Sequence, residues 1–163
     1  MTKFCAILFY IQSFICNINA QVLTKISIDN LTKELEQNDD TLRITNLWAT
    51  WCKPCVEELP HFLALSKAYK TSGIKVKFIL LAVEDKYETV RTFLTKKMMP
   101  LDNFACLDDK DANHWIPKID LEWQGELPVS LFIQTQNKIR EFHKGVLTKD
   151  ILQNKIENYI KKN

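Results

Sequence analysis

An apolar segment that ends at a pair of closely spaced cysteines constrains the fold of this chain most. Residues 42–49 (LRITNLWA) have the composition of a buried β-strand, and Cys52 and Cys55 follow shortly after it. A helix is predicted to begin near Pro54, because a first helical turn does not need the N–H that proline lacks. The sequence therefore places two sulfurs where a strand gives way to a helix.

Strand-like and helix-like segments alternate along the rest of the chain. The helix that begins near Pro54 is predicted to stop at Thr71-Ser72-Gly73, where glycine suits a helix end. Residues 76–83 (VKFILLAV) are almost continuously apolar, as in a central parallel strand covered on both faces. This order predicts an α/β fold with a mixed central β-sheet flanked by helices on both faces. Further strands are predicted at 104–107, 129–133 and 139–142, and further helices at 88–97 and 148–161.

Two regions have a less regular pattern. Residues 25–28 are expected to form an edge strand, and Asp29 is expected to cap a helix that runs to residue 36. Residues 108–127 are expected to be an insertion with a short helix around Trp115. Trp115 and Trp123 in this insertion serve either as core residues or as a lid, and the sequence does not choose between them.

Composition excludes several classes of protein. Hydrophobic residues make up 46% of the 163 residues, and no repeat or Pro/Gly/Ser-rich linker divides the chain, so one domain is expected. The 22 Lys+Arg and 20 Asp+Glu nearly balance, which gives no basic stripe for nucleic acid. We therefore expect a chain that does not bind nucleic acid. We also expect a monomer.

The first twenty residues have the layout of a signal peptide. Residues 4–15 (FCAILFYIQSFI) carry no charge, follow Lys3, and are shorter than the roughly 20 apolar residues that span a bilayer. We expect cleavage after Ala20, which leaves residues 21–163 as one domain exported to the periplasm or cell envelope. The alternatives are an N-terminal core strand, an uncleaved anchor, or lipid attachment at Cys16.

The location of the cysteine pair suits thiol-disulfide exchange. Outside the cytosol, nearby thiols can form a lasting disulfide. The helix dipole and Lys53 favour a thiolate at Cys52, which is predicted to be the attacking nucleophile. Cys55, one turn further into the helix, is predicted to be the resolving thiol that displaces the reduced product.

Other interpretations of the cysteines compete with this one. A CxxC pair is also half of a zinc site, but neither Cys106 nor the histidines at 61, 114 and 143 have typical zinc-ligand spacing. No metal or other cofactor is therefore expected. A purely structural disulfide is the second alternative. Cys106 is predicted to be a buried core residue, with a third redox role as the alternative.

Residues 46–60 (NLWATWCKPCVEELP) resemble the active-site segment of thioredoxin-like proteins, and more narrowly that of the exported TlpA/ResA group of thiol-disulfide oxidoreductases. The resemblance extends through residues 76–83, Pro128, Gly145 and the last helix. It implies a thioredoxin fold in which Pro128 is a cis-proline that faces the two sulfurs. Leu127 would then offer backbone groups to an extended substrate segment, with Trp51 and Pro54 also contacting the substrate.

The same resemblance singles out Glu58. This residue lies three positions after Cys55 on the same helical face. Thioredoxins usually carry a buried aspartate where Asn46 stands, and in the TlpA/ResA group the acid lies at the position of Glu58. A partly buried carboxylate has a raised pKa and can accept the Cys55 proton. The alternative is a solvent-facing glutamate, which suits Glu57 better.

The resemblance implies a reductase of extracytoplasmic protein disulfides, re-reduced by a membrane electron donor. The partners are then disulfide- or thiol-containing proteins. An oxidase or isomerase would use the same residues at a different reduction potential. A non-catalytic binding module is the alternative from another class. Peroxidase activity is a third, disfavoured because residues 46–60 contain no Thr-x-x-Cys site.

Overall fold

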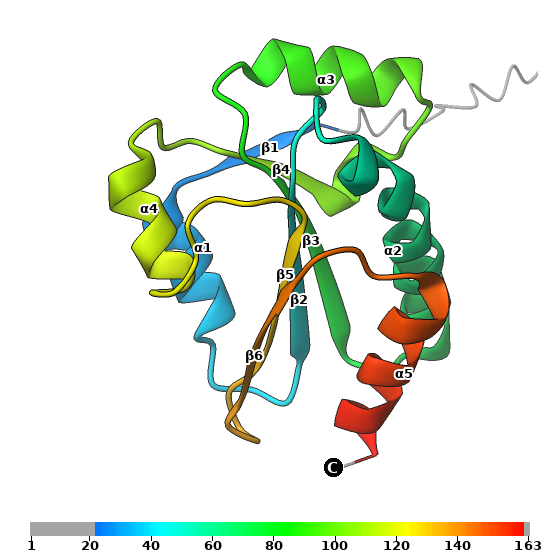
Figure 1. The fold of residues 1–163 in the computed structure, drawn as a ribbon. Coiled ribbons are helices and arrows are strands. Elements are labelled where there is room, and N and C mark those ends of the chain that lie inside the picture. Colours follow the sequence, from blue (N-terminus) through cyan, green and yellow to red (C-terminus); the bar gives the residue numbers. More distant parts are fainter. Residues whose placement is uncertain (1–21, 162–163) are drawn as a thin grey trace, which may run out of the picture.

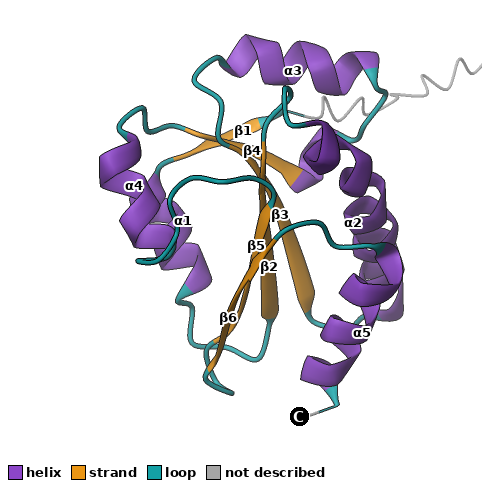
Figure 2. Cartoon of the chain, viewed as in Figure 1, coloured by secondary structure: helices purple, strands orange, loops and turns teal. Residues whose placement is uncertain are grey.

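The computed structural model describes residues 22–161, which form a mixed six-stranded sheet with helices on both faces (Figures 1 and 2). The strand order is β1-β4-β3-β2-β5-β6. The predicted α/β architecture is therefore confirmed. In chain order the elements are β1 (Thr24–Ile26), α1 (Ile28–Leu35), β2 (Leu42–Trp48), α2 (Lys53–Ser72), β3 (Val76–Ala82), α3 (Tyr87–Lys96), a 3-10 helix (Leu101–Asn103), β4 (Phe104–Leu107), α4 (Ala112–Ile119), β5 (Val129–Gln134), β6 (Ile139–Lys144) and α5 (Lys149–Ile160).

Strand β2 lies at the centre of the sheet and is buried along its whole length, as its apolar composition predicts. It pairs in parallel with β3 and antiparallel with β5. Its side chains alternate between the two faces. Ile44 and Trp48 belong to the core that also contains α2, α3 and α5 residues, whereas Leu47 belongs to the core beneath α1 and α4. Two apolar cores thus hold the sheet, one on each face.

Helix α2 begins immediately after the first cysteine of the pair. Cys52 is the N-cap residue, and Pro54 lies in the first turn. The helix ends at Gly73, whose φ of 71° is a left-handed conformation that glycine adopts without strain. Both predicted boundaries of this helix are confirmed.

The predicted cap of the first helix is wrong. Ser27, rather than Asp29, is the N-cap residue of α1, and its hydroxyl accepts a hydrogen bond of 3.2 Å from the Asn30 N–H. Asp29 lies inside the first turn, where a carboxylate is favoured by the helix dipole instead. The preceding edge strand, expected at 25–28, ends earlier because Ser27 already begins the cap; it covers Thr24–Ile26 and pairs in parallel with β4.

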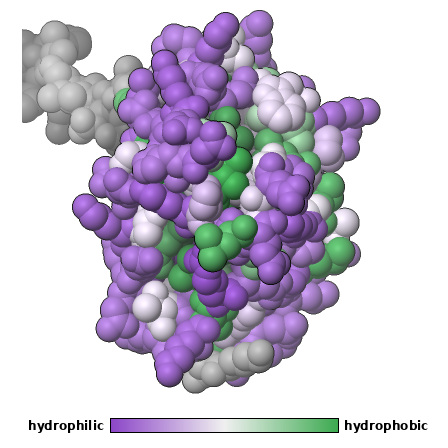
Figure 3. All heavy atoms as spheres, turned by 60° about the vertical axis from the view of Figure 1, so that its left-hand side comes forward, coloured by the Kyte–Doolittle hydropathy of each residue, from purple (hydrophilic) through white to green (hydrophobic). Residues whose placement is uncertain are grey.

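The two tryptophans of the 108–127 insertion are core residues. Trp115 and Trp123 are both buried, and their ring centroids lie 5.4 Å apart. Trp123 also lies 6.0 Å from the Phe142 ring of β6, and its indole N–H donates to the Glu126 carbonyl. On the face shown in Figure 3, hydrophilic side chains predominate and apolar ones show only in small patches.

Residues 1–20 lie outside the described residues, and so do the expected cleavage after Ala20 and the lipid attachment at Cys16. Among the helices between residues 22 and 161, none combines the length and apolar character needed to cross a membrane.

The packing of the insertion predicts that Trp123→Ala destabilises the domain by about 3–5 kcal/mol, because it removes a large buried ring. Urea unfolding followed by circular dichroism measures this. Leu121→Ala in the same loop is the matched control, because Leu121 is 88% exposed and its truncation should change stability by less than about 0.5 kcal/mol. Equal stabilities of Trp123→Ala and the parent chain would show that the loop is a lid rather than core.

Candidate active site

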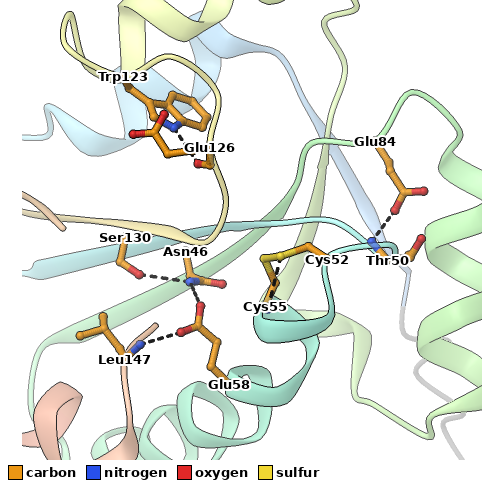
Figure 4. The surroundings of a disulfide bond; sticks show 10 residues. All are labelled: Asn46, Thr50, Cys52, Cys55, Glu58, Glu84, Trp123, Glu126, Ser130 and Leu147. Atoms are coloured by element: carbon orange, nitrogen blue, oxygen red, sulfur yellow. Dashed lines mark hydrogen bonds between the residues drawn. A yellow bond between two sulfur atoms is a disulfide. The ribbon is translucent and has the colours of Figure 1, made fainter. Parts of the chain in front are cut away.

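Cys52 and Cys55 form a disulfide at the junction of β2 and α2, with their Cα atoms 5.3 Å apart (Figure 4). The sulfur of Cys52 accepts the Cys55 N–H at 3.4 Å, so it lies at the positive end of the helix. Cys52 is 6% exposed and Cys55 is fully buried. An external sulfur can therefore reach Cys52 more readily, whereas the roles of nucleophile for Cys52 and resolving thiol for Cys55 stay predictions.

The turn before the disulfide is held by a carboxylate that follows another strand. The Cys52 N–H donates to the Ala49 carbonyl at 3.1 Å, and the Thr50 N–H donates to Glu84 Oε2 at 2.6 Å. Glu84 follows β3, which runs parallel to β2, so both strands end at the same edge of the sheet. Glu84 is not among the site residues predicted from the sequence. An acidic residue directly after a strand parallel to the one that leads to the cysteines is the signal that could have found it.

Glu58 is fully buried one turn after Cys55. Its Oε1 accepts a 2.7 Å hydrogen bond from Asn46 Nδ2, and its Oε2 accepts one of 2.7 Å from the Leu147 N–H (Figure 4). Burial raises the pKa of Glu58 to about 7, although both hydrogen bonds act in the opposite direction by stabilising the charged form. The expected burial and raised pKa are confirmed, and adjacent Glu57 is exposed.

A hydrogen-bond network extends from Glu58 to three other segments. Asn46 comes from β2 and donates also to the Ser130 hydroxyl of β5 at 3.1 Å. Leu147 comes from the loop between β6 and α5. The network therefore connects the active-site helix with the central strand, with the strand that follows Pro128, and with the loop before the final helix.

The Leu127–Pro128 peptide bond is cis, as the resemblance implied. The Pro128 carbonyl accepts the Gly145 N–H at 2.9 Å, which ties this bend to the end of β6. Lys144 forms a 2.9 Å ion pair with Glu126 on the other side of the bend. Pro128 is buried and Leu127 is half-buried.

The remaining candidates are distributed around this centre. Trp51 is 71% exposed beside Cys52, and Pro54 is exposed in the first turn of α2. Cys106 is a free, buried cysteine in β4, and burial raises the pKa of its thiol to about 11, so its predicted core role is confirmed. Within residues 22–161 no group of three His, Cys, Asp or Glu side chains is arranged to hold a metal ion.

Comparison with known proteins gives relatives that are named thiol-disulfide oxidoreductases or thioredoxin-like proteins. The thiol-disulfide oxidoreductase ResA of Oceanobacillus iheyensis is 28% identical over 126 residues, which are 77% of this chain and 61% of that protein. The chain thus spans about three fifths of the length of this relative. No family model matches the sequence.

Solved structures share the fold. A thioredoxin-related protein from Neisseria meningitidis serogroup B has a TM-score of 0.60 at 24% identity, with 78% of this chain and 90% of that chain covered. A secreted Mycobacterium tuberculosis disulfide oxidoreductase homologous to E. coli DsbE has a TM-score of 0.52 at 21% identity, with 74% and 84% covered. The implied thioredoxin fold is therefore confirmed.

The raised pKa of Glu58 predicts a stability that falls with pH. Between pH 4.5, the ordinary pKa of a glutamate, and about pH 7, Glu58 of the folded chain holds a proton that the unfolded chain releases. The free energy of unfolding should therefore fall by roughly 3 kcal/mol as the pH rises through this interval. Urea unfolding of the oxidised chain at pH 4.5 and pH 8 measures the fall.

Glu58→Gln should remove this fall, whereas Glu57→Gln, at the exposed neighbouring position, should retain it. The same pH dependence in the Glu58→Gln variant would contradict the assignment of the fall to Glu58.

Proposed function

We propose that this chain, a member of the thioredoxin-like superfamily, is a thiol-disulfide oxidoreductase. Its Cys52–Cys55 pair undergoes thiol-disulfide exchange with disulfides of other proteins. The observation that carries the proposal is a disulfide at a helix N-terminus with a buried carboxylate one turn further on. The first position activates a thiolate, and the carboxylate provides a proton acceptor whose pKa of about 7 suits neutral pH.

The reaction begins with the reduced chain. The Cys52 thiolate attacks one sulfur of a substrate disulfide, which forms a mixed disulfide and releases the first substrate sulfur as a thiolate. Glu58 then takes the proton of Cys55, and the Cys55 thiolate attacks the Cys52 sulfur. The second substrate sulfur leaves, both substrate thiolates take protons from solvent, and two electrons have passed from the chain to the substrate.

We assign substrate contact to the residues around Cys52. Trp51 and Pro54 are exposed beside it, and Leu127 precedes the cis-proline Pro128. Backbone groups at Leu127 can pair with an extended substrate segment as an added strand does. This arrangement favours substrates that are unfolded or have exposed loops at their disulfides.

The proposed direction is reduction of extracytoplasmic protein disulfides, with a membrane electron donor that restores the dithiol. An oxidase or isomerase would use the same residues, so the reduction potential distinguishes them, over a range of roughly −270 to −120 mV. Equilibration with glutathione buffers measures this potential. A value near the lower end supports the reductase.

Export is part of the proposal. Its support is the uncharged segment at residues 4–15 and the Mycobacterium tuberculosis neighbour that is described as secreted. Mass spectrometry of the N-terminus of the expressed chain tests it: Gln21 indicates cleavage after Ala20, and a lipidated Cys16 indicates an anchor.

Insulin reduction by dithiothreitol, catalysed by this chain, should depend on both cysteines. Cys52→Ser should abolish the catalysed rate, because no nucleophile remains. Cys55→Ser should accumulate a mixed disulfide that non-reducing electrophoresis detects, because no resolving thiol remains. Cys106→Ala is the control and should retain the activity. A parent chain without cysteine-dependent activity would instead indicate a binding module.

Glu58→Gln should slow resolution of the mixed disulfide by roughly 100-fold at pH 7.5, because Cys55 loses its proton acceptor. Stopped-flow measurement of product release gives this rate. In the parent chain the rate should rise through about pH 7 as Glu58 ionises, and this rise should be absent from the variant. Glu57→Gln is the matched control. Equal rates in the Glu58→Gln and Glu57→Gln variants would contradict the role of Glu58.

A further inference from the structure

The side-chain oxygen of Asn46 has no hydrogen-bond partner, although Asn46 is fully buried. The other end of the same carboxamide is fully used, since Nδ2 donates both to Glu58 and to Ser130. Above about pH 7, where Glu58 is ionised, its carboxylate can only accept hydrogen bonds, so the amide nitrogen must face Glu58 and the orientation of the carboxamide follows. A buried acceptor without a donor is costly and calls for an explanation.

The unpaired oxygen lies on the side of the disulfide. Figure 4 shows the Asn46 oxygen directed away from Ser130 and toward Cys52 and Cys55. Cys55 and Glu58 are three residues apart in α2, so their side chains lie on the same face of the helix, next to the carboxamide that contacts Glu58. In the disulfide, however, neither sulfur carries a hydrogen that could be donated.

We propose that Asn46 is a positioning residue whose oxygen accepts the S–H of Cys55 when the pair is reduced, while its amide nitrogen holds Glu58. This inference rests on the proposed redox function of the pair. Reduction of the disulfide adds two electrons and two protons, and one of these protons supplies the missing donor on Cys55. One carboxamide then holds the thiol that must lose a proton and the carboxylate that receives it.

The consequence is a dependence of stability on redox state. The oxidised form contains a buried acceptor without a donor, and the reduced form satisfies it, although S–H is a weak donor. Asn46 therefore favours the dithiol and raises the reduction potential of the pair. Removal of the Asn46 oxygen should make the disulfide easier to form.

The test compares two nearly isosteric substitutions in β2. Asn46→Leu removes the unpaired oxygen beside the disulfide, together with the amide nitrogen that donates to Glu58 and Ser130. Thr45→Val removes a different buried oxygen without a partner, the Thr45 hydroxyl. Because Thr45 and Asn46 are neighbours in β2, this hydroxyl lies on the opposite face of the sheet. Both variants and the parent chain are equilibrated with glutathione at pH 8, where Glu58 of the parent chain is ionised.

We expect Asn46→Leu to favour the disulfide by about tenfold, which is about 30 mV toward more negative potential, and Thr45→Val to leave the potential unchanged. An unchanged potential in Asn46→Leu, or an equal shift in both variants, would overturn the proposal. Insulin reduction by the parent chain is measured in parallel. Absence of insulin reduction would refute the proposed function but not the role of Asn46, because the glutathione equilibrium reports only on the Cys52–Cys55 pair of the chain.

A second measurement needs no substitution in the buried network. The ¹³Cγ resonance of Asn46 should move between the oxidised and reduced parent chain as its oxygen gains a donor, whereas that of exposed Asn30 should not. In reduced Cys55→Ala the Asn46 resonance should remain near its oxidised position, because no S–H is present. A resonance at the reduced position in this variant would overturn the proposal even if Asn46→Leu failed to fold.

Discussion

The burial of the Glu58 carboxylate is the constraint on which the rest of the site depends. A carboxylate removed from water must be hydrogen-bonded, and here each oxygen accepts one strong N–H bond, from Asn46 and from Leu147. These donors come from segments that are far apart in the sequence. Both donors are therefore present only in the folded domain, and the desolvation that they do not offset keeps the pKa of Glu58 near neutrality.

The central strand β2 supplies what the acid needs without interrupting the core. Asn46 replaces an apolar side chain on the face that Ile44 and Trp48 otherwise fill. Its register places it between Leu80 of β3 and Ser130 of β5, and the hydroxyl of Ser130 accepts from its amide nitrogen. One polar residue in the middle of the sheet thus connects the active-site helix to the strand that follows the cis-proline.

Local patterns predicted the elements that position the cysteines, whereas pairing between distant segments determined the network around them. The spacing of Cys55 and Glu58 was readable because both lie on one helix. The contact of Glu58 with Leu147 was not readable, because it joins residues 89 positions apart. The contact of Glu84 with Thr50, across 34 positions, left only an indirect signal, the place of Glu84 directly after a parallel strand. Asp29 was wrongly preferred as a cap because both Ser27 and Asp29 are good capping residues, and only the backbone decides between them.

The burial of Cys106 has a consequence for electron counting. Within residues 22–161 it is the only thiol besides the active pair, and its high pKa and position inside β4 keep it from exchanging with that pair. The folded domain therefore exchanges two electrons and no more, at one defined pair of cysteines. Unfolding would expose a third sulfur and allow three pairings in place of one, so tertiary structure itself protects this part of the chain from disulfide scrambling.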